Sequence, residues 1–239
     1  MKDRIVLVTG ASSGIGLAAA KRFALAGASL VLVARGEERL QRLRGTLESG
    51  GVKVLSYCAD VGKEEEVRHV VSDVADRWGA PDVLVNNAGV GYRGAAEDLP
   101  PARFDEMLAT NVRGPFLFTR HILPLMKKRG AGHIVYVSSG AGKNGIAGLS
   151  GYCASKFALM GFAESVALEA KPFDVKISVV VPGSTNTDFH RTMGSEPSPE
   201  ARSSMIQPED IAETIYHVVT TAKTFWIYEV TTRAPLMGR

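Results

Sequence analysis

The sequence predicts an α/β domain whose seven-stranded parallel sheet is covered by helices on both faces. Short apolar runs rich in β-branched residues alternate with longer helical patterns from one end of the chain to the other. Several of these runs are apolar at consecutive positions, as expected of strands that are buried on both faces. At 239 residues the chain is long enough for one substantial core and short for two, so one domain is expected over residues 1–239.

The expected elements follow in chain order. Strands are expected at Ile5–Thr9, Leu30–Ala34, Val52–Cys58, Val83–Val85, Ile134–Val137, Ile177–Val181 and Phe225–Val230, and helices near 14–26, 37–49, 63–78, 102–129, 150–171 and 208–221. In the helix at 37–49 the leucines recur at helical spacing, so its arginines, among them Arg39, are expected to face solvent. The stretch 183–206 is rich in Ser, Thr, Pro and Gly, and such a long loop is usually a functional lid or a disordered segment.

Composition excludes several functional classes. Twenty-eight Lys and Arg against 25 Asp and Glu give a net charge of +3, which is too small to indicate nucleic acid or an anionic membrane as a partner. No apolar run reaches the length of a membrane span, and the N-terminus lacks a signal-peptide core. Cys58 and Cys153 are expected to be reduced thiols in a cytoplasmic protein, and the five histidines show no metal-ligand spacing.

A glycine-rich turn follows the first expected strand. The residues proposed to surround a pyrophosphate there are Gly10, Ser12, Ser13, Gly14, Ile15 and Gly16. A strand, a glycine turn and a helix N-terminus together bind a pyrophosphate, because glycines permit close approach and free N–H groups face the negative charge. The sequence therefore predicts a three-layer, doubly wound Rossmann-type fold, although the spacing is Gly-x-x-x-Gly-x-Gly instead of the commoner Gly-x-Gly-x-x-Gly.

Residues at the next strand ends predict the cofactor. The second strand ends with Ala34 and Arg35, where an acidic residue would bind both ribose hydroxyls of NAD. An arginine instead offers charge to a 2′-phosphate, so NADP(H) is inferred and NAD(H) is the less favoured alternative. At the third strand end, Asp60 and Val61 are expected beside the adenine, and Asp60 is also interpreted as a helix cap. The small residues of Asn87-Ala88-Gly89 permit close passage of the chain beside a cofactor.

Tyr152 and Lys156 carry the expected chemistry. Four residues apart, they lie on one face of a helix. A free tyrosine has a pKa of about 10, and a nearby ammonium can lower that pKa by about 1–3, toward acid–base work at neutral pH. Ser139, thirteen residues before Tyr152, can donate a hydrogen bond to the same reacting oxygen. Ser138 is the competing choice.

Together these residues resemble the short-chain dehydrogenases/reductases in their compact single-domain form. The resemblance spans the whole chain and includes the Thr9–Gly16 turn, Asp60, Asn86–Gly89, Asn111, Ser139, Tyr152, Lys156, Pro182-Gly183 and Thr187. It implies reversible hydride transfer between NADP(H) and a carbonyl or alcohol of a small molecule. Given a reduced NADPH pool, carbonyl reduction is the expected direction.

The resemblance also implies individual roles. Tyr152 is expected to exchange the proton and Ser139 to polarise the substrate oxygen. Lys156 would bind the nicotinamide ribose and lower the pKa of Tyr152, while Asn111 would hold a water connected to Lys156. Contacts to the carboxamide and the start of the lid are expected from Pro182, Gly183, Thr185 and Thr187.

Several points stay open at this level. A partly apolar substrate pocket is expected from Val90, Tyr92, Ile146, Phe189, Met193 and Met205, with His190 a candidate for substrate contact, but no substrate is identified. A homotetramer or homodimer is implied, through the long helices near 102–129 and 150–171. The alternatives are a non-catalytic NADP(H)-binding or sensing protein and, as a minor one, an epimerase or dehydratase, for which the chain leaves no room for an added C-terminal substrate domain.

Overall fold

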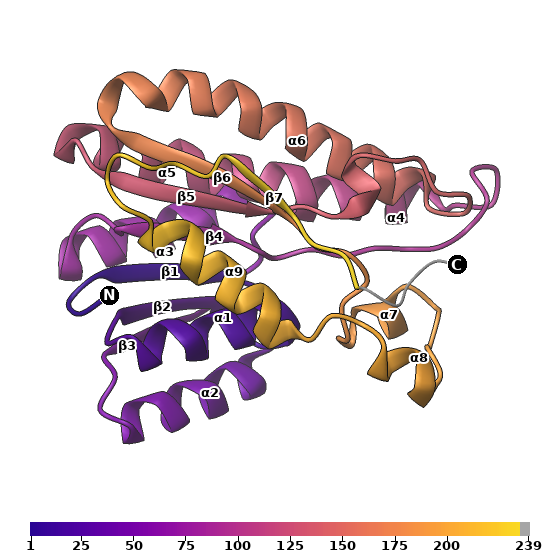
Figure 1. Cartoon of the computed structure of the whole chain (residues 1–239), viewed down its shortest axis with the longest axis horizontal. Coiled ribbons are helices and arrows are strands. Elements are labelled where there is room, and N and C mark those ends of the chain that lie inside the picture. Colours follow the sequence, from indigo (N-terminus) through magenta and orange to yellow (C-terminus); the bar gives the residue numbers. More distant parts are fainter. Residues whose placement is uncertain (235–239) are drawn as a thin grey trace.

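A parallel sheet runs through the computed structural model, which describes residues 1–234 (Figure 1). Its strands are β1 (Ile5–Thr9), β2 (Ser29–Ala34), β3 (Val54–Cys58), β4 (Val83–Asn86), β5 (Gly132–Val137), β6 (Val175–Val181) and β7 (Glu229–Thr231). Their order is β3-β2-β1-β4-β5-β6-β7, and every neighbouring pair is parallel. The predicted seven-stranded parallel sheet is confirmed.

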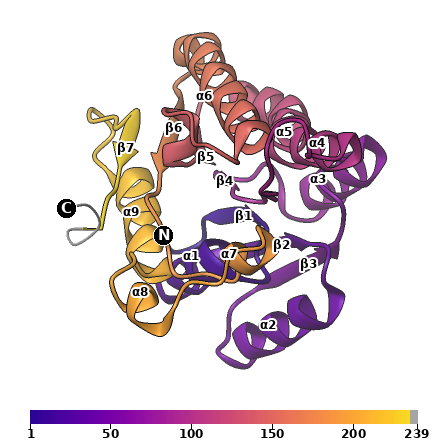
Figure 2. The same cartoon turned by 90° about the vertical axis from the view of Figure 1, so that its right-hand side faces the viewer.

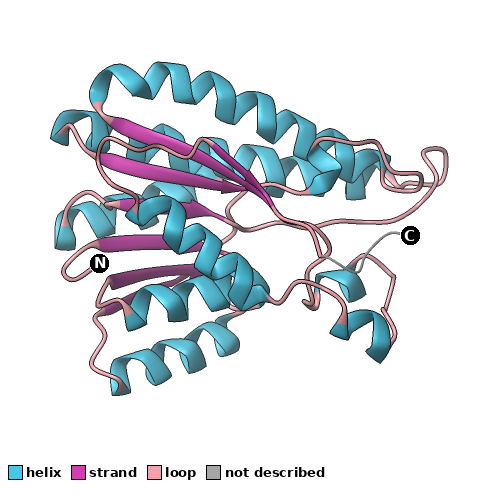
Figure 3. Cartoon of the chain, viewed as in Figure 1, coloured by secondary structure: helices cyan, strands magenta, loops and turns pink. Residues whose placement is uncertain are grey.

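Helices cover both faces of this sheet (Figure 3). One face carries α1 (Gly14–Leu25), α2 (Glu37–Ser49) and α9 (Pro208–Thr220), and the other carries α3 (Glu64–Trp78), α4 (Pro101–Leu108), α5 (Gly114–Arg129) and α6 (Ser150–Ala170). Successive residues of a strand face opposite layers. Val6 and Val8 therefore join the first core, whereas Leu7 between them joins the second. Burial on both faces explains the uninterrupted apolar runs of the strands.

The prediction of a single helix over 102–129 is wrong in detail. Helices α4 and α5 are separated by one π-helical turn, Ala109–Arg113, with the fully buried Asn111 at its centre. The Asn111 side chain bonds to the backbone of Val90 and to Ser155, which ties the turn to its neighbours. Such turns occur frequently at functional sites.

The last strand, β7, is shorter than the predicted strand Phe225–Val230 and begins later in the chain, at Glu229. Phe225 is exposed, and the Trp226 indole Nε1 donates 2.8 Å to the carbonyl of Ile177 in β6. The side chain of Trp226 thus occupies the Ile177 carbonyl, and backbone pairing of β7 with β6 begins only at Glu229. The third strand begins at Val54 instead of Val52.

The segment 183–206 contains two short helices, α7 (Phe189–Thr192) and α8 (Pro199–Ser203), so it is not irregular throughout. An isolated bridge between Thr185 and Ile206 joins its ends, and Arg202 donates 2.9 Å to Asn186 Oδ1. Figures 1 and 2 show α7 and α8 beyond the carboxyl ends of the strands.

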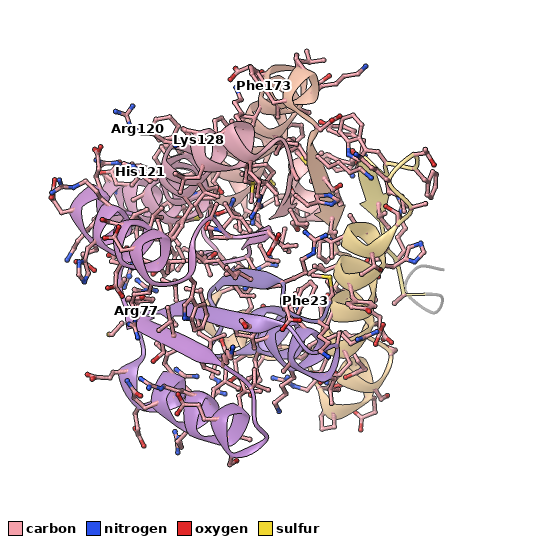
Figure 4. All side chains as sticks on the ribbon, turned by 90° about the vertical axis from the view of Figure 1, so that its left-hand side faces the viewer. Phe23, Arg77, Arg120, His121, Lys128 and Phe173 are labelled. Carbon is pink, nitrogen blue, oxygen red and sulfur yellow. The ribbon has the colours of Figure 1, made fainter. Side chains whose placement is uncertain are left out.

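Strand order reverses between β1 and β4, and ligands of doubly wound sheets bind at the carboxyl ends of strands beside such a reversal. Figure 2 looks onto this edge. Figure 4 shows the opposite edge, where Arg77, Arg120 and Lys128 are exposed and Phe23 lies buried inside.

Candidate active site

A cleft of about 970 Å³ lies at the carboxyl edge of the sheet. It is lined by nearly all residues that the sequence proposed for a cofactor, namely Gly10, Ser12, Ser13, Gly14, Ile15, Arg35, Asp60, Val61, Asn87, Ala88, Gly89, Tyr152, Lys156, Pro182, Gly183, Thr185 and Thr187, together with Ser139. The glycine turn and the tyrosine helix therefore open onto one space. Gly16 and Asn111 lie behind its wall.

The glycine turn depends on having no side chains. Gly10 and Gly14 have φ values of 65° and 51°, in the left-handed region that favours glycine. A Cβ at Gly10 would lie 2.9 Å from the Ala88 Cα atom, and one at Gly16 would lie 2.3 Å from the Gly10 carbonyl oxygen. The Ser13 side chain makes no capping bond at the start of α1. The turn is thus a backbone surface at a helix N-terminus, which fits a pyrophosphate.

Thr9 and Asn87 join the glycine turn to the end of β4. The Thr9 hydroxyl accepts from the backbone N–H groups of Asn87 and Ala88, each at 3.0 Å. The Asn87 amide donates 2.9 Å to the Thr9 carbonyl. These bonds hold the two sides of the strand reversal together, so the small residues Ala88 and Gly89 form a fixed wall of the cleft.

Two arginines line the end of the cleft beside β2. Arg35 is 55% exposed in its side chain, and its Nη1 lies 3.3 Å from Glu106 Oε1. Arg39 is exposed, as its helical pattern predicted, and it also lines the cleft. It is the third residue of α2, so its side chain remains at the strand-end edge, and this nearness to Arg35 in sequence is the signal that could have found it.

The capping interpretation of Asp60 is wrong. Helix α3 begins at Glu64 with Lys63 as its N-cap, and Asp60 Oδ1 instead accepts 2.9 Å from the Gly62 N–H. Glu66 reaches back and accepts from the Asp60 backbone N–H at 2.7 Å. These two bonds fix the turn that presents Asp60 and Val61 to the cleft.

Tyr152 and Lys156 are almost fully buried, at 7% and 4% exposure. Burial raises the pKa of Tyr152 to about 12, against the opposing effect of the Ser139 hydroxyl. Burial lowers the pKa of Lys156 to about 8. The Lys156 Nζ atom donates 3.0 Å to the Val137 carbonyl and lies 5.8 Å from the centre of the tyrosine ring.

Lys156 is not among the groups that shift the pKa of Tyr152 here, so the lowering of that pKa by Lys156 stays a prediction. Desolvation of the phenol outweighs other effects, because the apolar side chains of Met107, Leu149 and Met193 pack around it. Tyr152 is protonated at neutral pH, as an unburied tyrosine also is.

Ser139 and Ser138 differ in environment. Ser139 begins a short 3₁₀ turn, and its hydroxyl accepts 3.2 Å from the Ala141 N–H. Within residues 1–234, the buried Ser138 hydroxyl has no hydrogen-bond partner. A Cβ at Gly142 would lie 2.7 Å from that hydroxyl, so it is crowded against the following turn.

Asn111 acts on the site from behind. Its Oδ1 accepts from Val90 N–H and its Nδ2 donates to Val90 carbonyl, both at 2.8 Å, and Nδ2 also donates 2.9 Å to the Ser155 hydroxyl. Ser155 in turn donates 2.8 Å to the Tyr152 carbonyl. Sequence reasoning missed Ser155; its place between Tyr152 and Lys156 on one helix was the available signal.

The wall beside Tyr152 is apolar. Of the expected pocket residues, Val90, Tyr92, Ile146, Phe189 and Met193 line the cleft, and Leu149 joins them. Met205 does not line it and is buried, which corrects that expectation. The rings of Tyr152 and Phe189 are 5.6 Å apart.

His190 also lines the cleft, where its Nε2 is paired with the Thr185 carbonyl at 3.1 Å. This contact lies within the segment 183–206. The histidine thus helps to hold that segment in place.

No helix among residues 1–234 has both the length and the apolar character that a bilayer crossing requires. Across the same residues, His, Cys, Asp and Glu form no group of three or more that could hold a metal ion.

The comparisons agree with this geometry. A family model for short chain dehydrogenases matches residues 4–198. Dehydrogenase/reductase SDR family member 4 of Bos taurus is 34% identical over 199 residues, which are 83% of this chain and 71% of that protein.

Solved structures are similar over nearly the whole chain. A metagenomic short-chain oxidoreductase in complex with NADP superposes with a TM-score of 0.86 at 34% identity, covering 98% of both chains. The 3-ketoacyl-(acyl-carrier-protein) reductase of Brucella melitensis, complexed with NADH, has a TM-score of 0.86 at 30% identity and covers 96% of this chain and 97% of its own.

Proposed function

The chain belongs to the short-chain dehydrogenase/reductase family and is an oxidoreductase acting on CH–OH and C=O groups, and from this premise we propose that it uses NADP(H) with Tyr152 as the acid–base residue. The observation that carries the proposal is the single cleft lined by the glycine turn, Arg35, Ser139, Tyr152 and Lys156. One extended dinucleotide can contact both its ends.

The glycine turn and α1 hold the pyrophosphate, and Arg35 with Arg39 holds the 2′-phosphate. Guanidinium groups suit this role because they bind phosphate oxygens through two parallel donors. NADP occurs in one similar structure and NADH in another, so the support for NADP(H) in this chain is the pair of arginines at the end of β2.

The nicotinamide supplies the hydride for reduction of a carbonyl carbon, or accepts one from an alcohol. During reduction, the Tyr152 hydroxyl gives its proton to the carbonyl oxygen, and Ser139 donates a hydrogen bond to that oxygen as negative charge develops. Tyr152 is protonated at neutral pH, as carbonyl reduction requires of its proton donor. Lys156 has donors beyond the one used by Val137, and these hold the nicotinamide ribose.

The substrate is a small carbonyl compound with an apolar portion. Val90, Ile146, Leu149, Phe189 and Met193 supply the apolar wall. Segment 183–206 acts as the lid over it, since α7 brings Phe189 against Tyr152.

A screen of carbonyl compounds tests this function. We expect NADPH oxidation with apolar ketones or aldehydes, at a higher kcat/KM than with NADH. Tight cofactor binding without oxidation across the panel would favour the non-catalytic alternative, and preference for NADH would overturn the cofactor assignment.

A homo-oligomer forms through the layer that contains α5 and α6. Phe116, Phe157 and Leu168 are exposed there, and a Cβ at Gly161 would meet open space. We infer that these side chains form the contact, because contiguous apolar patches on a surface mark interaction sites.

Leu168→Glu combined with Phe157→Glu should therefore convert the assembly to monomers in light scattering at micromolar concentration. Leu25→Glu changes a more exposed leucine on α1, at 86% exposure, and should leave the assembly intact. A monomeric parent protein would contradict the assignment.

A further inference from the structure

A carboxylate pairs with Arg35 at the arginine end of the cleft. Glu106, on α4, is 71 residues from Arg35 in sequence, yet its Oε1 lies 3.3 Å from Arg35 Nη1. Its other oxygen, Oε2, accepts from the Tyr92 hydroxyl at 2.7 Å and from Arg103 Nη1 at 3.1 Å. The Arg103 guanidinium lies over the Tyr92 ring, 4.4 Å from its centre.

The Glu106 carboxylate therefore pairs with two arginines, with Arg35 through Oε1 and with Arg103 through Oε2. The hydrogen bond from Tyr92, with further bonds from both arginines, holds the pKa of Glu106 below its usual range, so it is ionised at neutral pH. The Glu106 side chain is 30% exposed and that of Arg35 is 55% exposed, so the pair is accessible to an incoming anion. Arg35 is neutralised by an internal carboxylate before any phosphate arrives.

We propose that Glu106 is the exchangeable counter-ion of Arg35, displaced when a 2′-phosphate binds, and that it limits how strongly the chain prefers NADP(H). This inference rests on the proposed role of Arg35 as the 2′-phosphate group. A phosphate carries more charge than a carboxylate and offers more acceptor oxygens, so it competes successfully for the guanidinium. Displacement leaves no orphaned charge, because Glu106 keeps its bonds to Tyr92 and Arg103.

The consequence is a specificity effect confined to the 2′-phosphate. Glu106→Gln keeps an acceptor for Tyr92 and Arg103 but removes the charge that attracts Arg35. An exposed ion pair of this kind changes an equilibrium by about 1.5- to fivefold. The variant should therefore bind adenosine 2′,5′-bisphosphate about 1.5- to fivefold more tightly than the parent, with unchanged affinity for AMP, which lacks only the 2′-phosphate.

Calorimetric titration of the full chain with these two nucleotides measures the effect without turnover. Asp105→Asn is the matched control, since Asp105 is exposed on the same helix and its loss changes the net charge equally. The control should leave both affinities unchanged. In an Arg35→Gln background, Glu106→Gln should have no effect on the bisphosphate.

The outcomes separate the two assignments. If the parent binds the bisphosphate more tightly than AMP but Glu106→Gln fails to tighten it, or Asp105→Asn tightens it equally, the counter-ion inference is overturned while the NADP(H) assignment stands. If the parent binds both nucleotides equally, Arg35 does not bind the 2′-phosphate, and both assignments are overturned.

Discussion

Tyr152→Phe removes turnover, lowering kcat for carbonyl reduction by about 10²- to 10⁴-fold, which is the contribution of a positioned general acid. The phenylalanine ring retains the packing against Phe189, whose ring lies 5.6 Å away. The lost hydroxyl is the group proposed to give its proton to the substrate oxygen. The affinity for NADPH should weaken by no more than about fivefold, the value of one hydrogen bond between neutral groups.

Steady-state NADPH oxidation and fluorescence titration with NADPH measure the two effects separately. Tyr136→Phe is the control, because Tyr136 is buried like Tyr152 but lies in the core. Its hydroxyl is hydrogen-bonded to the Thr119 hydroxyl at 2.7 Å. That variant should lose about 1 kcal/mol of stability and keep its turnover. Tyr152→Phe with more than a tenth of the parent rate would show that another group supplies the proton.

Lys156→Met has opposite effects on stability and activity. The parent folds with a buried ammonium whose pKa is lowered to about 8, so folding carries a cost for the charged form. Methionine fills a similar volume without charge, although the Val137 carbonyl loses its donor. We expect the free energy of unfolding to rise by about 1–3 kcal/mol at pH 7. Turnover should fall by about 10²-fold or more, because the donors for the ribose are lost.

The pH dependence of the stability gain identifies its cause. Between pH 8 and 10.5 the unfolded chain binds more protons at this lysine than the folded chain, so the parent gains stability as pH rises. The cost is complete below about pH 8 and absent above about 10.5, so the advantage of Lys156→Met should shrink over that window. Urea unfolding at pH 7 and 9.5 tests this.

Lys128→Met is the matched substitution. Lys128 is exposed at the edge of the molecule opposite the cleft, which Figure 4 shows. Its replacement should change stability by less than about 0.5 kcal/mol at either pH. A gain at Lys156 that does not vary between the two pH values would contradict burial of its charge as the cause.

The folded chain also shows where local patterns mislead. The run 102–129 has helical periodicity throughout, and the break at Ala109–Arg113 is associated with bonds from Asn111 to Val90 and Ser155 that no local pattern records. Asp60 has the sequence of a helix cap, but Glu66 and Gly62 give it a different set of bonds.

The sequence by itself determined the alternation of strands and helices, the double-sided burial of the strands, the glycine turn after β1 and the shared helical face of Tyr152 and Lys156. These properties depend on residue type and on spacing over a few positions along the chain, so a short stretch of sequence is enough to predict them. The tertiary structure alone decided that burial raises the pKa of Tyr152, that Glu106 pairs with Arg35, and that Asn111 bonds to Val90 behind the wall of the site. Burial and ion pairing depend on side chains brought together from distant parts of the chain, because desolvation and Coulomb attraction act through space and not along the sequence.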